Sequence, residues 1–195
     1  MNIFNNLTDE EKQKIKYLNL KTNEVLFHEG EECHNVYLVL QGRIEIVSYS
    51  LEGNEEIIST LKKDDVFANA LIFSKKNVFL GEIIAKEKTT LAYLSKTDLL
   101  NIFQRNTSFL EAYINLISEK TIRMTQKNKI LAHKSIRSRI ICFLECNEGK
   151  YLKNITSLSK ELVLPRPSVS REIHKMILEK LIFIKNGYIH LADFF

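Results

Sequence analysis

Residues 156–181 read TSLSKELVLPRPSVSREIHKMILEKL, a pattern that predicts two short helices joined by a tight connection. The first helix would carry Leu158 and Leu162 on one face. Pro167 falls in the first turn of the second helix, where a missing N–H costs nothing. The second helix has an apolar stripe with the spacing of an amphipathic helix, formed by Val169, Ile173, Ile177 and Leu181 and widened by Met176.

The outward side of the second helix would carry short hydroxyls and basic groups: Arg166, Ser168, Ser170, Arg171, His174 and Lys175. Such a face suits the major groove of DNA, because arginine pairs two-pronged with guanine and serine reaches a phosphate or a base. The alternative is an ordinary amphipathic helix with a solvated basic face. Beyond it, two strands are predicted around Asn186-Gly187, a favourable hairpin turn. A helix-turn-helix followed by a hairpin indicates a winged helix.

Composition is that of an ordinary globular protein: 195 residues, 45% hydrophobic and 27% charged. Residues 133–195 hold 11 Lys and Arg against 6 Asp and Glu, whereas the remainder holds 17 against 18, which fits nucleic-acid binding at the carboxyl end. No apolar run has the length of a membrane span and no signal-peptide core is present, so we expect a cytoplasmic protein without a membrane partner. Cys33, Cys142 and Cys146 lack the CxxC spacing of a metal site.

The front of the chain is rich in short strands. Residues 7–19 predict a helix capped by Thr8 and Glu11, and residues 145–154 a loop. About seven strand-like runs, punctuated by glycine turns, follow the predicted helix. They favour a jelly roll or barrel. These runs cover residues 25–30, 35–42, 43–50, 55–61, 66–73, 78–86 and 89–95.

A heptad pattern follows the strands and predicts a long helix. Because such a helix is long for so small a domain, we expect it to pair in parallel with a second copy, although the same face could instead pack on its own barrel. Polar residues on the seam cost stability and favour one register. The seam residues are Leu110, Ile114, Ile117, Thr121, Met124, Asn128 and Leu131.

Four segments, in order, resemble the Crp/Fnr family of bacterial transcription regulators. They are LFHEGEECHNVYLVLQGRIEIVS, IISTLKKDDVFANALIF, KSIRSRIICFL and LPRPSVSREIHKMILEKLI. The resemblance implies an α+β chain with a jelly-roll-like β-roll sensor (residues 1–105), a dimerisation helix (106–132) and a winged helix-turn-helix (133–195). It also implies a homodimer that binds a roughly palindromic DNA site, with RNA polymerase as a further partner.

Departures from the family concern the effector. Cyclic-AMP receptors of the family hold ribose and phosphate with Gly-Glu and Arg-Ser pairs, and Ala68-Asn69 and Phe79-Leu80 stand in their places. A buried phosphate without a cation is costly, so we expect no cyclic nucleotide. The candidate pocket residues could enclose a small apolar effector or pack shut, and the second is favoured. They are Phe67, Asn69, Phe79, Leu80, Met124 and Thr125.

Other cofactors are not expected either. The cysteine cluster of the iron–sulfur branch is missing, and His28 and His34 are read as strand or turn residues rather than haem ligands. Cys33 is read as an ordinary thiol rather than a redox switch.

In the predicted recognition helix, the family's Glu-x-x-Ser-Arg corresponds to residues 167–171, PSVSR. The glutamate, which can accept from cytosine, is missing, so the preference for one base of each half-site should change. Arg171 and then Arg166 are the expected base contacts, and Ser168 and Ser170 the expected phosphate or positional contacts. His174, Lys175 and Lys185 are the candidates for contacts with the DNA backbone. Val163 replaces the usual turn glycine and Pro165 the usual cap.

Two other functions fit parts of the pattern. A cupin-like metalloenzyme shares the strand pattern, but its converging histidines are missing, so no enzyme is expected. An effector-independent regulator, or a dimeric interaction protein that no longer reads an operator, remains open.

Overall fold

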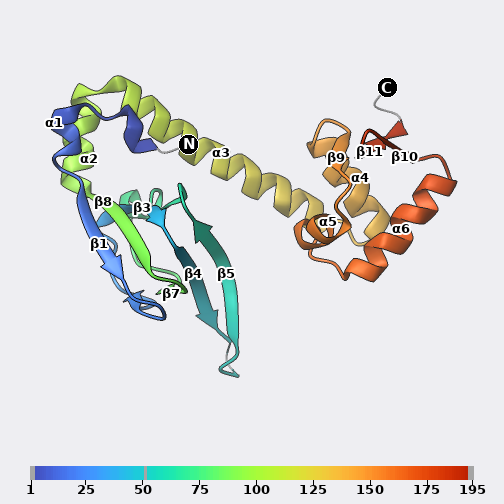
Figure 1. Ribbon diagram of the computed structural model, residues 1–195, viewed down its shortest axis with the longest axis horizontal. Coiled ribbons are helices and arrows are strands. Elements are labelled where there is room, and N and C mark those ends of the chain that lie inside the picture. Colours follow the sequence, from blue (N-terminus) through green and yellow to red (C-terminus); the bar gives the residue numbers. More distant parts are fainter. Residues whose placement is uncertain (1–2, 51, 193–195) are drawn as a thin grey trace. The chain divides into compact units, whose positions relative to one another are not determined.

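The computed structural model describes residues 3–50 and 52–192. The chain forms two compact units, Met1–Ile117 and Ser118–Phe195. One helix, α3 (Thr107–Ala132), contributes residues to both (Figure 1). Among the described residues, no helix combines the length and the apolar character needed to cross a membrane.

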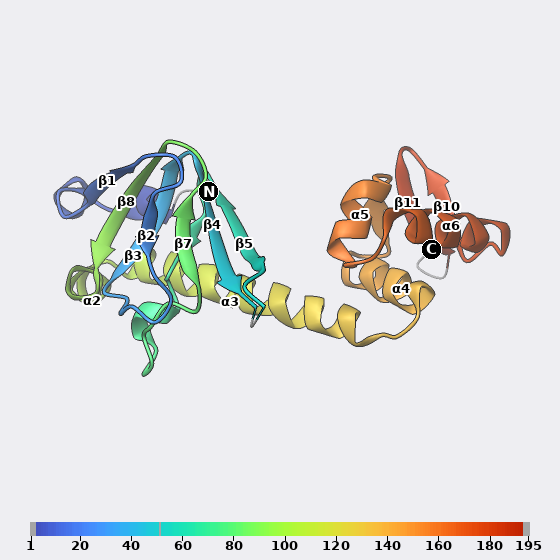
Figure 2. The same cartoon turned by 90° about the horizontal axis from the view of Figure 1, so that it is seen from below.

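The first unit is built on two antiparallel four-stranded sheets, with strand orders β1-β8-β3-β6 and β2-β7-β4-β5. Apolar side chains of both sheets share one core, as alternating strands with one buried face require. Figure 2 shows the longer strands of the two sheets beside one another in the first unit. The strands are β1 (Lys16–Leu20), β2 (Val25–Phe27), β3 (Asn35–Gln41), β4 (Arg43–Tyr49), β5 (Glu55–Lys62), β6 (Val66–Phe67), β7 (Glu82–Ala85) and β8 (Thr89–Ser95).

Two expectations for this unit are wrong in part. The predicted helix over residues 7–19 is only α1 (Asp9–Lys12): its capping box of Thr8 and Glu11 is present, but β1 follows and pairs with β8. The predicted strand over residues 66–73 ends after β6, because Ala68 has a left-handed backbone with φ of 60°. Three short helices complete the unit: η1 (Ile3–Asn6), η2 (Leu71–Phe73) and α2 (Lys96–Arg105).

The start of α3 packs on the β-roll. Phe109 and Tyr113 are buried in its core, and Leu116 lies partly buried against it. Their spacing of three to four residues places them on one side of the helix. The long helix predicted from the heptad pattern is therefore present, and one of its sides covers the roll.

The second unit combines three helices with a three-stranded antiparallel sheet of order β10-β11-β9. Residues Asn186 and Gly187 turn the β10–β11 hairpin with φ of 51° and 78°, as a turn with two left-handed residues requires. The predicted loop over residues 145–154 is wrong in part, since β9 lies within it and pairs with β11. The elements are α4 (Ile136–Cys146), β9 (Lys150–Leu152), α5 (Ile155–Glu161), α6 (Arg166–Leu178), β10 (Ile182–Lys185) and β11 (Tyr188–Leu191).

Candidate nucleic-acid interface and effector pocket

Helix α6 buries its apolar stripe and exposes its basic side. Val169, Ile173 and Met176 lie in the core of the second unit, and Ile177 packs against it. Leu181 lies beyond the end of the helix, where it still packs on this core. Of the predicted DNA contacts, Ser168 is partly buried, and the exposed ones are Arg166, Ser170, Arg171, His174 and Lys175. The sequence therefore identified the side of α6 that faces solvent.

Two other arginines of the second unit are occupied by internal contacts. Arg137 of α4 donates from Nε to Glu172 Oε1 at 2.7 Å and, through both terminal nitrogens, to the carboxylate of Glu179 at 2.7 and 2.9 Å. The hydrogen bonds to Glu179 and then Glu172 raise the pKa of Arg137 above its usual value. Arg139 donates to backbone carbonyls, from Nε to His133 at 2.8 Å. Arg137 therefore fixes α6 against α4, whereas Arg166 and Arg171 form no ion pair within the described part of the chain.

The turn between α5 and α6 is strained at one residue. Val163 has φ of 52°, and its side chain is 60% exposed. A β-branched residue is a strong outlier in this left-handed region. The turn thus keeps the geometry of the glycine that the family resemblance implies there. At the start of α6, Pro165 caps the helix without a side-chain hydrogen bond.

Replacing Val163 with glycine is expected to raise the free energy of unfolding. Relief of the left-handed conformation is worth about 1–2 kcal/mol, and the added freedom of glycine in the unfolded chain offsets about 0.4–1 kcal/mol of it. The expected gain is about 0.5–1 kcal/mol, measured by urea or thermal unfolding. Val163→Ala is the matched control, because it removes the exposed side chain and retains most of the backbone strain. An equal gain from alanine would contradict this explanation.

A hollow of about 280 Å³ lies in the β-roll at the predicted effector site. Four of the six predicted pocket residues, Phe67, Asn69, Phe79 and Leu80, line it, and its use by an effector stays a prediction. Asn69 is the polar residue of the lining, and none of the described lining residues carries an ionisable side chain. Met124 and Thr125 are exposed on α3 and do not line the hollow, so their part in a pocket stays a prediction. The lining residues are Ile46, Ile58, Phe67, Ala68, Asn69, Ala70, Leu71, Phe79, Leu80 and Ile83.

Helix α3 contacts a wall of this hollow directly. The hydroxyl of Tyr113 donates to the backbone carbonyl of Asn69 at 2.7 Å, across 44 positions of sequence. Burial raises the pKa of Tyr113 well above its usual value, so the phenol stays protonated. The ring of Tyr113 also meets Phe103 edge-on at 5.0 Å. Any change in the backbone at Asn69 therefore acts on a buried, hydrogen-bonded residue of α3.

Aromatic side chains fill the roll behind the hollow. Phe67 stacks on Tyr37 at 5.0 Å, and Phe79 stacks on Phe27 at 4.4 Å. Burial raises the pKa of Tyr37 to about 12. This environment suits apolar groups, because transfer of a charge into it without a partner costs much more than transfer of a neutral group.

Comparison with known proteins agrees with this architecture. Residues 17–106 match the cyclic nucleotide-binding domain family. The chain is 24% identical over 203 residues to the putative HTH-type transcriptional regulator ycf28 of Porphyra purpurea, covering 97% of this chain and 82% of that protein. It is 22% identical to the cAMP-activated global transcriptional regulator CRP of Pasteurella multocida, covering 61% of this chain and 57% of that one.

Solved structures extend the likeness over nearly the whole chain. The catabolite activator protein of Thermus thermophilus has a TM-score of 0.58 at 19% identity, covering 98% of this chain and 94% of that one. A CooA mutant from Carboxydothermus hydrogenoformans has a TM-score of 0.60 at 18% identity, covering 100% and 93%. The chain therefore shares the fold of these proteins. The α+β architecture predicted from sequence is confirmed.

The predicted seam is largely exposed on α3. Ile114 is 52% exposed and Met124 67%, and Thr121 and Asn128 are also exposed. Leu110, Ile117 and Leu131 are partly buried, and Ile117 packs on the core of the β-roll. The side of α3 that carries Ile114 is thus distinct from the side that Tyr113 buries, and its pairing with a second copy stays a prediction.

The histidines and cysteines considered as sensor groups have ordinary partners. His28 Nδ1 lies 2.9 Å from Glu82 Oε1, and this hydrogen bond raises the pKa of His28. His34 Nε2 lies 3.4 Å from a carboxylate oxygen of Glu32. Cys33 is buried, and burial raises the pKa of its thiol, which disfavours the reactive thiolate. Among the described residues, no three His, Cys, Asp or Glu side chains gather as metal ligands would.

Proposed function

We propose that this protein is a sequence-specific transcription regulator whose α6 helices read a roughly palindromic duplex site. The observation that carries the proposal is the exposed row of Arg166, Ser170 and Arg171 on a helix that Arg137 fixes in place. Helix α6 therefore presents preorganised donors without first breaking an ion pair of either arginine. Arg171 is assigned to a guanine edge and Ser168 and Ser170 to phosphate or positional contacts. His174, Lys175 and Lys185 are assigned to the DNA backbone.

The same proposal includes a homodimer formed along α3. Exposed Ile114 and Met124, together with Thr121 and Asn128, supply an apolar seam with register-setting polar positions. Two α6 helices held by such a dimer would enter major grooves about one helical turn apart. RNA polymerase is the expected partner at the promoter.

For the β-roll we propose a small, neutral and mostly apolar effector in place of a cyclic nucleotide. The support is the open hollow with Asn69 as its polar group, and the lack of any cation in its described lining. The Tyr113–Asn69 hydrogen bond offers a route from the effector to α3. Calorimetric titration of the purified protein with cyclic AMP and cyclic GMP is expected to show no saturable binding. Tight binding of either nucleotide would overturn this part of the proposal.

Replacing Arg171 with alanine is expected to weaken binding to the specific site by about 1–3 kcal/mol and to relax preference at one base pair of each half-site. Selection of duplexes from a random pool would supply the site, and titration against it would measure the loss. Lys175→Ala is the matched control: loss of a phosphate contact should weaken all sequences about equally and reduce the salt dependence. An unchanged footprint and preference in Arg171→Ala would contradict the assignment.

A further inference from the structure

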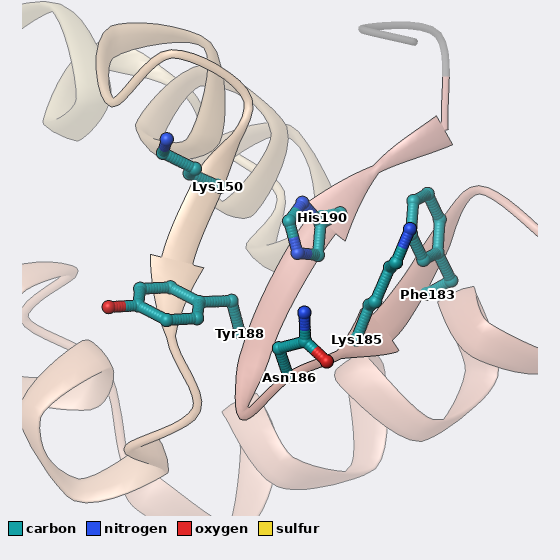
Figure 3. A pocket seen from close by; sticks show the side chains of 6 residues that line it. All are labelled: Lys150, Phe183, Lys185, Asn186, Tyr188 and His190. Carbon is teal, nitrogen blue, oxygen red and sulfur yellow. The ribbon is translucent and has the colours of Figure 1, made fainter.

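The outer surface of the three-stranded sheet in the second unit carries an unusual set of side chains, here called the wing face. The register pairs Phe183 with His190 and His190 with Lys150 across the three strands. A second row pairs Lys185 with Tyr188 and Tyr188 with Leu152. Figure 3 shows five of these six side chains together with Asn186 of the hairpin turn. The wing face comprises Lys150, Leu152, Phe183, Lys185, Tyr188 and His190.

The wing face is separate from the core of the unit. Ile182, Ile189 and Leu191, at alternate positions, are buried on the other side of the sheet against the cluster that includes α4 and α6, whereas Ile184 is 39% exposed. The solvated side of an antiparallel sheet is ordinarily polar. Here Tyr188 is 41% exposed and Leu152 is 54% exposed, so apolar area remains in water.

A shallow hollow of about 610 Å³ lies on this face, lined by Lys150, Phe183, Lys185, Asn186, Tyr188 and His190. The rings of Phe183 and His190 are stacked, with centroids 5.0 Å apart and planes at 10°. Tyr188 lies at the other side of His190, with ring centroids 6.4 Å apart. None of the described lining residues carries a carboxylate, so an anion meets lysines without a competing negative charge.

We propose that the wing face binds single-stranded nucleic acid. Exposed aromatic rings stack on bases of any sequence, and lysines beside them neutralise phosphates. The two rows are two residues apart along the strands, or about 7 Å, which leaves room for a base on each. Lys150 and Lys185 belong to the two outer strands, on opposite sides of β11, so they suit successive phosphates of a strand better than the single phosphate of a free nucleotide.

This site differs from the base-reading surface of α6 and does not rest on the proposed function, although Lys185 of the wing face is also assigned to the duplex backbone. None of the expected base contacts of α6 lines the hollow. Binding should therefore depend little on sequence, since stacking reads no base edge. Single-strand binding should also survive the loss of Arg171.

The test uses the full chain and a labelled oligothymidylate of about eight nucleotides, within the usual site size of stacking surfaces, measured by fluorescence anisotropy at low salt. Tyr188→Ala is expected to weaken binding about tenfold or more, whereas Tyr188→Phe keeps the ring and the affinity. Lys150→Gln and Lys185→Gln should each lower the slope of log affinity against log salt by about 0.7. Arg171→Ala should leave this binding unchanged.

Three outcomes would overturn the inference. The first is equal affinity of Tyr188→Ala and the unaltered protein, and the second is an unchanged salt slope in both lysine variants. The third is displacement of the oligonucleotide by an equal concentration of thymidine monophosphate, which would make the wing face a small-ligand site. Duplex titration of the same variants keeps a failure here distinct from a failure of duplex reading by α6.

Discussion

Replacing Gly42 with alanine is expected to lower the free energy of unfolding by about 2–5 kcal/mol. Gly42 joins β3 to β4 with φ of 89°, a left-handed conformation that costs other residues about 1–2 kcal/mol. A Cβ there would also meet the hydroxyl of Thr89 and come within 2.6 Å of the carbonyl oxygen of Lys88. Overpacking against backbone adds about 1–3 kcal/mol. Urea unfolding followed by circular dichroism would measure the loss.

Gly30→Ala is the matched control for this prediction. Gly30 has nearly the same φ, 87°, but no atom lies within 4 Å of the position of its added Cβ. Its loss should be about 1–2 kcal/mol, from the backbone alone. The difference between the two variants therefore isolates the close approach of β8 to the β3–β4 turn. Equal losses would show that contact with Thr89 and Lys88 carries no penalty.

Thr89 explains why this turn cannot move aside. Its hydroxyl accepts from the backbone N–H of Arg43 at 3.2 Å, and the side chain is fully buried. A shift of the β3–β4 turn would break that hydrogen bond and leave the buried Thr89 hydroxyl with the carbonyl of Glu87 as its remaining partner, which costs stability. The packing of Gly42, of Thr89 and of the ends of β3, β4 and β8 is thus interdependent.

Local patterns carried most of the correct predictions. The stripe of Val169, Ile173 and Met176 and the Asn186-Gly187 turn are read within a few residues, and the structure places both as expected. The predictions that were wrong concern strands that pair with segments far away in the sequence. Lys16–Leu20 forms β1 because it pairs with β8 in an antiparallel register from Lys16↔Tyr93 to Leu20↔Thr89, and nothing within residues 7–19 signals that partner.

The candidate site also combines features that local patterns predict with contacts between distant residues that they do not predict. The exposed side of α6 follows from helical spacing, whereas the Tyr113–Asn69 hydrogen bond joins residues whose proximity no local pattern indicates. The wing face was also missed. The sequence shows the alternation of Phe183 and Lys185 with Ile182, but Lys150 joins them only through β9, a strand that lies within the predicted loop.

In the proposed homodimer, replacing Ile114 with glutamate is expected to separate the two copies and to reduce affinity for the proposed operator at least 100-fold. Ile114 is 52% exposed in the single chain, so the change should not disturb the β-roll core. In a parallel dimer the two copies of Ile114 would meet on the seam, and two carboxylates buried there would repel and lose hydration. Light scattering would give the mass, and duplex titration the affinity.

Ile122→Glu is the matched control, because Ile122 is an isoleucine of the same helix that is 57% exposed. It follows the seam position Thr121 by one residue and so points about 100° around the helix from it. This variant should remain dimeric and keep its operator affinity. Loss of the dimer leaves one reading head per molecule, so binding of Ile114→Glu should fall towards the non-specific range of about 10⁻⁴–10⁻⁶ M. If Ile114→Glu stayed dimeric with full affinity while Ile122→Glu did not, the pairing surface would lie on the other side of α3, and the register inferred from Thr121 and Asn128 would be wrong.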